Sequence, residues 1–261
     1  MAERESIGRT LLVAGGVALV CSLVVSSTVY WLRPIQLAYR SLDQNFAIIV
    51  AAGLATPDAT LADSEVVERF LQLESRLIDL DSGTYAEQSS LTAQTYDFQA
   101  AADNPEQSRE ISEVEDIAGL GRRPDLMPVY ILRTGETIDR VVLPIYGRGM
   151  WSTIYGYLCI EGDLLTVAAV HFYEHGETPG IGDRIQDPAW IARWVGKRIY
   201  ADDGTLTLRV GTGGVGSGAF APVDAITGAT VTVMAVDKFV RYWLGDAAYG
   251  PFLANLRNEL N

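Results

Sequence analysis

The stretch PVYILRTGETIDRVVLP, residues 128–144, decides the fold of most of this chain. Two runs rich in β-branched and aromatic residues, 128–133 and 137–144, flank the tripeptide Thr134-Gly135-Glu136. Apolar runs of this length on either side of a glycine turn predict a β-hairpin. We therefore expect a pair of antiparallel strands at the centre of the fold.

A second hairpin pattern follows the first one directly. The runs TIYGYLCI (153–160) and LLTVAAVHFY (164–173) flank Glu161-Gly162-Asp163. Two consecutive hairpins predict a mainly antiparallel sheet. Segments with helical spacing precede and follow it, so we expect an α+β domain with helices flanking the sheet.

Residues 11–32 read LLVAGGVALVCSLVVSSTVYWL and carry no charge. As a helix they span about 33 Å, enough for a hydrocarbon core of about 30 Å. The alternative is a cleaved signal peptide, but such peptides have apolar cores of only about 7–15 residues and a small-x-small cleavage site. Ser26-Ser27-Thr28 is a poor substitute for that site. We therefore predict one uncleaved transmembrane helix after a short N-terminus, residues 1–10.

Basic residues flank both ends of this apolar segment. Arg4 and Arg9 precede it, and Arg33 and Arg40 follow it. Because orientation follows an excess of Lys and Arg on one side, these arginines do not decide it.

Residues 33–60 form a juxtamembrane segment in which we expect a helix and then a break at Gly53 and Pro57. Thr60 and Asp63 fit a capping box that opens a further helix. We expect that helix to end near Gly83. Its apolar face is expected to comprise Val67, Phe70, Leu71, Leu77 and Ile78.

Local patterns also predict the structure of four further segments. Residues 84–124 are polar and irregular, which predicts a surface excursion or a lid. Residues 187–198 (DPAWIARWVGKR) predict a short helix with Pro at its first position, and residues 205–210 (TLTLRV) predict a strand. Val233 to Trp243 follow helical spacing, which predicts a helix beginning near Gly228.

The composition excludes several classes of protein. The net charge of −13 argues against nucleic-acid binding, which depends on clustered Lys and Arg. Cys21 and Cys159 are the two cysteines, too few for a disulfide framework, a four-cysteine zinc site or a self-contained iron-sulfur cluster. His171 and His175 are four residues apart, but they lie at the end of a predicted strand, so we interpret them as ordinary strand-end residues.

Residues 211–216 read GTGGVG and match the dinucleotide fingerprint G-x-G-x-x-G. That fingerprint requires a helix opening within the motif, whereas Pro222 follows and no βαβ unit surrounds it. We interpret this stretch as a flexible turn. The chain also lacks the nucleophile elbow, Walker, HExxH and CxxC motifs.

Three loops remain as candidates for a site: YGRGMWS (146–152), EHGETPGIGDRIQDPAW (174–190) and DAITGATVT (224–232). If a helix begins near Gly228, its unpaired N–H groups and positive dipole end surround Thr230 and suit a phosphate. The small Gly-Ala pair would let another molecule approach the Thr230 hydroxyl. Alternatively, Thr227 caps the helix and nothing binds, and residue physics alone leaves the two interpretations about even.

Residues 224–230, Asp-x-x-Thr-Gly-Ala-Thr, resemble the acceptor motif of the flavin mononucleotide (FMN)-binding domain family. In that family a flavin transferase moves FMN from FAD onto the last hydroxyl of the motif, as a phosphoester. The resemblance implies that Thr230 carries the FMN, that Asp224 is the acidic position and that Thr227 is the first hydroxyl.

The resemblance extends over nearly the whole chain. GRGMWSTIYGYL (147–158), GETPGIG (176–182), DPAWIARWVGKR (187–198), LRPIQ (32–36) and NFAIIVAAGL (45–54) are similar to the C subunits of bacterial Na+-translocating NADH:quinone reductases. The G subunit of the Rnf complex shares the flavin motif but is shorter, and we rank it second. A membrane-anchored scaffold protein is the alternative from another class.

The resemblance implies an electron carrier in a multisubunit membrane enzyme. Its partners would be a B-type subunit with a second covalent FMN, membrane subunits with iron-sulfur centres, and the flavin transferase. The flavin domain, residues 61–261, would lie on the extracytoplasmic side of the bacterial inner membrane, with residues 1–10 in the cytoplasm. The resemblance places Trp151 and Ile181 against the flavin ring, and ordinary core packing is the alternative for Trp151. The other residues implied in FMN binding are Glu177, which could instead be a surface carboxylate, and Thr178, Gly180, Gly182, Gly228 and Ala229.

Overall fold

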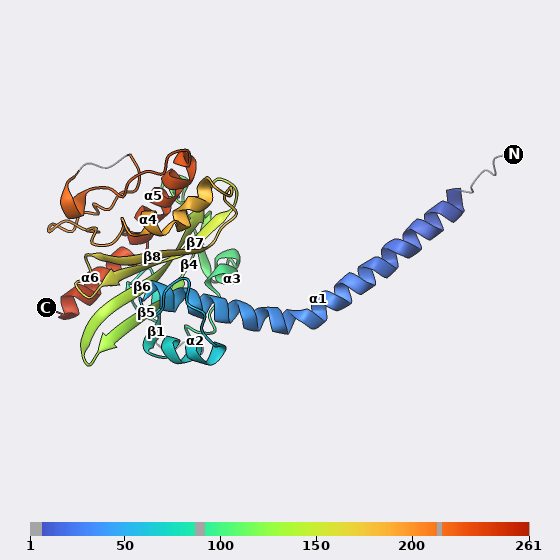
Figure 1. Ribbon diagram of the computed structural model, residues 1–261, viewed down its shortest axis with the longest axis horizontal. Helices are drawn as coiled ribbons and strands as arrows, with labels where there is room; N and C mark the ends of the chain where they lie inside the picture. The colour runs from blue at the N-terminus through green and yellow to red at the C-terminus, as the bar shows by residue number, and fades with distance from the viewer. Residues whose placement is uncertain (1–6, 87–91, 213–215, 261) are drawn as a thin grey trace. The chain divides into compact units, whose positions relative to one another are not determined.

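The computed structural model describes residues 7–86, 92–212 and 216–260 (Figure 1). Contacts divide the chain into two compact units, residues 1–44 and residues 45–261. The first helix, α1, runs without interruption from Ile7 to Ala51. Within it, Gly8–Arg33 is long and apolar enough to cross a membrane, and none of its most apolar window is buried by protein. The predicted N-terminal apolar helix is confirmed.

The last turns of α1 belong to the second unit. Residues 47–52 are buried there, and all of them except Val50 belong to a cluster that also contains Phe70, Tyr130 and Tyr157. The expected break follows directly, because Gly53 adopts φ +74° and ends the helical backbone.

The helix predicted between Thr60 and Gly83 is wrong in its second half and in its cap. Helix α2 covers only Asp63–Phe70, and strand β1 follows at Leu73–Asp79. The apolar residues 77 and 78 belong to this strand because β1 pairs along its full length with β5. The N-cap is Ala62, and its backbone N–H donates to the Glu65 carboxylate at 2.9 Å.

One six-stranded antiparallel sheet forms the centre of the second unit, in the order β2-β1-β5-β6-β7-β8. Both predicted hairpins are confirmed, since β5 pairs with β6 and β7 pairs with β8. Besides β1, the strands of this sheet are β2 (Thr84–Tyr85), β5 (Leu126–Thr134), β6 (Thr137–Arg148), β7 (Thr153–Glu161) and β8 (Val167–Glu174).

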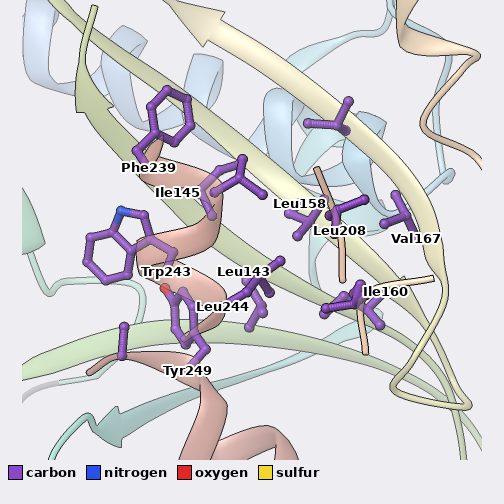
Figure 2. Close-up of a cluster of buried hydrophobic side chains, with 14 of the residues drawn as sticks. Leu143, Ile145, Leu158, Ile160, Val167, Leu208, Phe239, Trp243, Leu244 and Tyr249 are labelled. Carbon is purple, nitrogen blue, oxygen red and sulfur yellow. The ribbon is translucent and has the colours of Figure 1, made fainter. Parts of the chain in front are cut away.

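The two faces of the sheet are covered by different helices. Helices α5 (Thr230–Leu244) and α6 (Tyr249–Leu260) contribute to the larger core, which Figure 2 shows in part. Trp243 is fully buried there, and its indole N–H donates to the Tyr146 carbonyl at 2.6 Å. The end of α1 and α2 pack with alternate strand residues such as Val142 in the second core. An α+β fold with flanking helices is confirmed.

The prediction that residues 84–124 are irregular holds for most of the described residues of this segment, but it missed several short elements. Besides β2, this segment contains α3 (Phe98–Asp103) and the small sheet β3 (Ser108–Glu110) with β4 (Arg122–Pro124). Phe98 is buried in the main core, and the fully buried Arg123 donates to the Ala247 carbonyl and to Asp81. The polar composition gave no sign of these elements, because they are held in place by a few contacts to residues far away in the sequence. Residues 87–91 lie outside the described residues.

The segment between β8 and α5 is mostly irregular. It contains the short helices η1 (Gly182–Gln186), α4 (Pro188–Ile191) and η2 (Gly218–Phe220). Pro188 is the first residue of α4, as predicted, but the helix ends at Ile191, well before residue 198. The strand predicted at 205–210 is wrong, because this stretch forms only isolated bridges, from Leu206 to Tyr200 and from Val210 to Val223. The predicted turn at 211–216 includes residues 213–215, which lie outside the described residues.

Candidate functional site

The three loops singled out in the sequence meet at the start of α5. The β6–β7 loop (residues 149–152), the 176–182 loop and the first turn of α5 surround a hollow of about 170 Å³. Its lining residues are Met150, Glu177, Thr178, Ile181, Gly182, Gly228, Ala229, Thr230, Val231 and Thr232. These segments lie far apart in sequence, so the sheet and α5 bring them together.

The first turn of α5 has no side-chain cap. The N-cap residue is Ala229, whose side chain cannot accept a hydrogen bond. The alternative in which Thr227 caps the helix is therefore wrong, because Thr227 lies two residues before the N-cap. Thr230 is exposed and occupies the first helical position. Its hydroxyl thus stands at the positive end of the helix dipole.

Gly228 forms the backbone turn that leads into α5. It adopts φ +86°, a conformation that L side chains rarely take, and a Cβ at this position would have no atom within 4 Å. The glycine is therefore required by the backbone turn, and the space above it stays open. Ala229 is buried and secures the turn against the core.

The 176–182 loop contains a tight turn at Thr178-Pro179-Gly180-Ile181. The Thr178 carbonyl accepts hydrogen bonds from the N–H groups of Ile181 at 3.1 Å and Gly182 at 3.0 Å. Gly180 has φ +74°, as a glycine at the third position of a type II turn with preceding proline does. This turn leaves the Ile181 side chain 48% exposed at the hollow.

Trp151 is not a core residue. Its side chain is 67% exposed, and its indole N–H donates to the Thr178 hydroxyl at 3.1 Å. The β6–β7 loop is also tied to the neighbouring loop by Gly176, whose N–H donates to the Ser152 hydroxyl at 2.6 Å. An exposed indole beside the exposed Ile181 gives the hollow an apolar rim.

Glu177 is not a surface carboxylate either, since it is only 5% exposed. One carboxylate oxygen accepts from the N–H groups of Met150 at 2.9 Å and Trp151 at 3.1 Å. The other accepts from the Thr232 hydroxyl at 2.5 Å. Glu177 therefore contacts two of the three segments and lies on the third.

Some of the sequence-predicted residues do not line the hollow. Asp224 pairs with Arg193 at 2.9 Å, and its carbonyl accepts from the Trp190 indole at 2.7 Å. The carbonyl of Thr227 accepts from Arg184 at 3.4 Å. Gly180 and Trp151 lie beside the hollow rather than in its lining. Asp224 thus anchors the start of the 224–230 motif away from Thr230.

The two histidines have different surroundings. His171 lies on β8, where burial lowers the pKa of its imidazole, and the His175 ring accepts a hydrogen bond from the Glu177 N–H at 3.3 Å. Among the described residues, no group of three His, Cys, Asp or Glu side chains could hold a metal ion.

Sequence reasoning missed Met150, Val231 and Thr232 in the hollow. The sequence predicts an ordinary first-turn residue at Thr232, yet it is 3% exposed and bonded to Glu177. A signal was present, because Thr232 precedes Val236 by four residues and therefore lies on the buried helix face. A threonine on such a face needs a partner for its hydroxyl.

The sheet, the uncapped helix and the apolar-rimmed hollow together define the class of protein. Residues 149–245, which include all three segments, match the model of the FMN-binding domain family. The chain is 40% identical to the C subunit of the Na(+)-translocating NADH-quinone reductase of Pseudomonas aeruginosa, over 98% of each chain. It is 38% identical to the same protein of Vibrio alginolyticus, over 99% of each chain.

Solved structures agree with these sequence matches. The crystal structure of Shewanella oneidensis NqrC matches with a TM-score of 0.75 and 33% identity, over 85% of this chain and 99% of that one. The corresponding C subunit from Parabacteroides distasonis matches in fold, with a TM-score of 0.64 at 23% identity, over 85% of this chain and 96% of that one.

Identity over nearly the full length decides the family. The chain belongs to the C-subunit family of Na+-translocating NADH-quinone reductases, which are oxidoreductases of several subunits. Full-length identity favours this family over the G subunits of Rnf complexes, and the FMN-binding domain argues against a plain scaffold.

Proposed function

We propose that this chain carries electrons within its complex through an FMN joined by a phosphoester to Thr230. The observation that carries this proposal is the exposed Thr230 hydroxyl at the first position of a helix without a side-chain cap. The free N–H groups and positive dipole of a helix start suit a phosphate, so the residues present fit the group. Gly228 and Ala229 would admit the phosphate and offer backbone N–H groups.

The flavin ring would rest at the surface of the hollow. The hollow measures about 170 Å³, whereas pockets that enclose a drug-sized ligand measure roughly 300–1,000 Å³. Trp151 and Ile181 would contact the ring through their exposed side chains, and Glu177, Thr178 and Gly182 would line its inner side. Gly180, Asp224 and Thr227 would act by shaping the loops around the site.

Bound FMN would supply reversible one- and two-electron chemistry, while the protein holds and orients it. A covalent tether suits a shallow site, since it keeps the local concentration on the order of mM or more even where noncovalent contacts are weak. An exposed ring would remain accessible to partner subunits. Its partners would be a B-type subunit with its own covalent FMN and membrane subunits with iron-sulfur centres.

The N-terminal apolar helix would anchor the domain in the inner membrane, with the flavin on the extracytoplasmic side. The resemblance to the C-subunit family supports this orientation, which the flanking arginines leave undecided. A test is the labelling of an engineered surface cysteine in the domain by a membrane-impermeant thiol reagent on intact cells. Labelling only after the inner membrane is opened would contradict the extracytoplasmic placement.

The attachment itself is tested by producing the full chain with a flavin transferase and precipitating it with acid. The pellet should retain flavin, and the peptide containing Thr230 should carry the mass of FMN less water. Thr230→Val keeps the β-branched shape and should abolish covalent flavin. The matched variant Thr227→Val removes the first hydroxyl of the motif and should leave flavin on Thr230. Covalent flavin in Thr230→Val, or none in the native chain, would contradict the proposal.

A further inference from the structure

Glu177 is a buried carboxylate whose charge has no ion-pair partner among the described residues. Burial of a carboxylate opposes folding unless hydrogen bonds compensate it. Here two backbone N–H groups and one hydroxyl donate to it, and the positive end of α5 lies beside it. An isolated buried charge at the edge of a site needs a reason beyond stability.

The two oxygens of this carboxylate bond to two different segments of the site. One holds Met150 and Trp151 of the β6–β7 loop, and the other holds Thr232 in the first turn of α5. Since Glu177 itself belongs to the 176–182 loop, one side chain fixes all three segments relative to one another. Thr232 lies two residues after Thr230, so this contact also fixes the turn that presents the proposed attachment residue.

Two glycines leave the space that the carboxylate occupies. A Cβ on Gly149 would lie 2.6 Å from a Glu177 carboxylate oxygen, and a Cβ on Gly182 would lie 2.8 Å from the Glu177 Cβ. Real Cβ atoms essentially never approach so closely. Both glycines therefore allow the loops to pack closely on Glu177, and Gly149 also lies close to Ile154 and to the Ser152 carbonyl.

We propose that Glu177 is the positioning residue of the flavin site: its carboxylate sets the distance between the β6–β7 loop and the first turn of α5. It thereby sets the space in which a ring attached at Thr230 rests. This inference rests on the proposed function. It assigns Glu177 a role that acts through Met150, Trp151 and Thr232, rather than electron transfer of its own.

The test uses the full chain produced with a flavin transferase, as native protein, Glu177→Ala, Glu177→Gln and Gly149→Ala. Attachment is read from the mass of the Thr230 peptide, and ring placement is read from the visible circular dichroism of the bound flavin. We expect all four proteins to carry FMN, because the acceptor motif is intact. Glu177→Ala and Gly149→Ala should lose about twofold or more of the visible circular dichroism, because the loops no longer hold the ring in one place.

Glu177→Gln should retain the native signal. Its amide oxygen can accept from the same two N–H groups, and the Thr232 hydroxyl can rotate to accept from the amide nitrogen. Glu174→Ala is the matched control, because this carboxylate is exposed at the end of β8 and should leave the signal unchanged. A native signal in Glu177→Ala, or a lost signal in Glu177→Gln, would overturn the inference.

Hydrogen exchange of the flavin-free chain separates this inference from the proposed function. The amides of Met150 and Trp151 should be protected in the native chain and should lose protection in Glu177→Ala, even if Thr230 never carries FMN. Unchanged protection would refute the positioning role on its own. If Glu177→Ala does not fold, Gly149→Ala provides the second test, since its added Cβ would push against the Glu177 carboxylate oxygen as well as against Ile154 and the Ser152 carbonyl.

Discussion

The two ends of helix α5 differ in how far their side chains are buried. The last turn is buried against the sheet, with Phe239, Trp243 and Leu244 at 0% exposure. The first turn has an exposed Thr230, a Val231 that is 55% exposed, and no side-chain cap. We infer from this difference that packing at one end of the helix holds the other end in place, where functional groups can stay exposed.

The largest expected effect lies at the buried end. Trp243→Ala should lower the free energy of unfolding by about 3–5 kcal/mol, because it opens a cavity and leaves the Tyr146 carbonyl without its donor. Urea unfolding of the flavin-free chain measures the change. Trp243→Phe keeps most of the volume and should cost less. A loss below about 1 kcal/mol for the alanine variant would mean that this end does not anchor the helix.

We expect the packing of α5 on strand β6 to affect both the stability of the buried end of the helix and the position of its exposed end. A Cβ on Gly147 would overlap the Cβ of Phe239, so Gly147→Ala should force the helix away from the sheet. Overpacking of this kind costs about 1–3 kcal/mol of unfolding free energy. The same variant, loaded with FMN, should also show weaker visible circular dichroism. Gly135→Ala is a comparison outside the core: no atom lies within 4 Å of the added Cβ, so its cost comes from the positive φ of +64° rather than from overpacking.

Alkaline pH should lower the free energy of unfolding through ionisation of Tyr242, which lies at the buried end of α5. Burial raises the pKa of this phenol to about 12, against the opposing effect of Arg123. The unfolded chain releases the proton near pH 10, so the contribution of Tyr242 is fully present below that pH and is lost as pH rises towards about 12. Because the hydroxyl has no hydrogen-bond partner among the described residues, Tyr242→Phe should be nearly neutral at pH 7.

The measurement is the free energy of unfolding from pH 7 to about pH 11, which spans the unfolded-state pKa of the phenol. Tyr242→Phe should show a shallower decline than the native chain above the unfolded-state pKa. Equal slopes for the two proteins would show that other buried tyrosines carry the whole alkaline loss.

The smallest effect on stability is expected at the exposed end. Thr230→Val removes a hydroxyl from a surface position and should change the unfolding free energy of the flavin-free chain by no more than about 0.5 kcal/mol. The same substitution is expected to abolish flavin attachment. A large loss of stability would mean that Thr230 acts in the fold, and the contrast between the two ends of α5 would disappear.

Patterns confined to neighbouring residues predicted the fold well. The two hairpins, the apolar N-terminal helix and the helix from Thr230 each depend on a period or a turn that can be read locally. Errors arose where distant contacts decide the structure. The local pattern of β1 predicts a helix, and only its pairing with β5 makes it a strand. Residues 205–210 have strand composition, but they form only isolated bridges.

For the site, local sequence was enough to predict the three segments, because the acceptor-like motif and the two other loops carry unusual residues. The contacts among these segments could not be predicted, because they form between residues far apart in the sequence. Glu177, Met150 and Thr232 meet because the β6–β7 turn, the end of β8 and the start of α5 lie at one place in the fold. No local sequence pattern predicts these contacts, since residues far apart in the sequence come together only once the sheet and α5 have packed against each other.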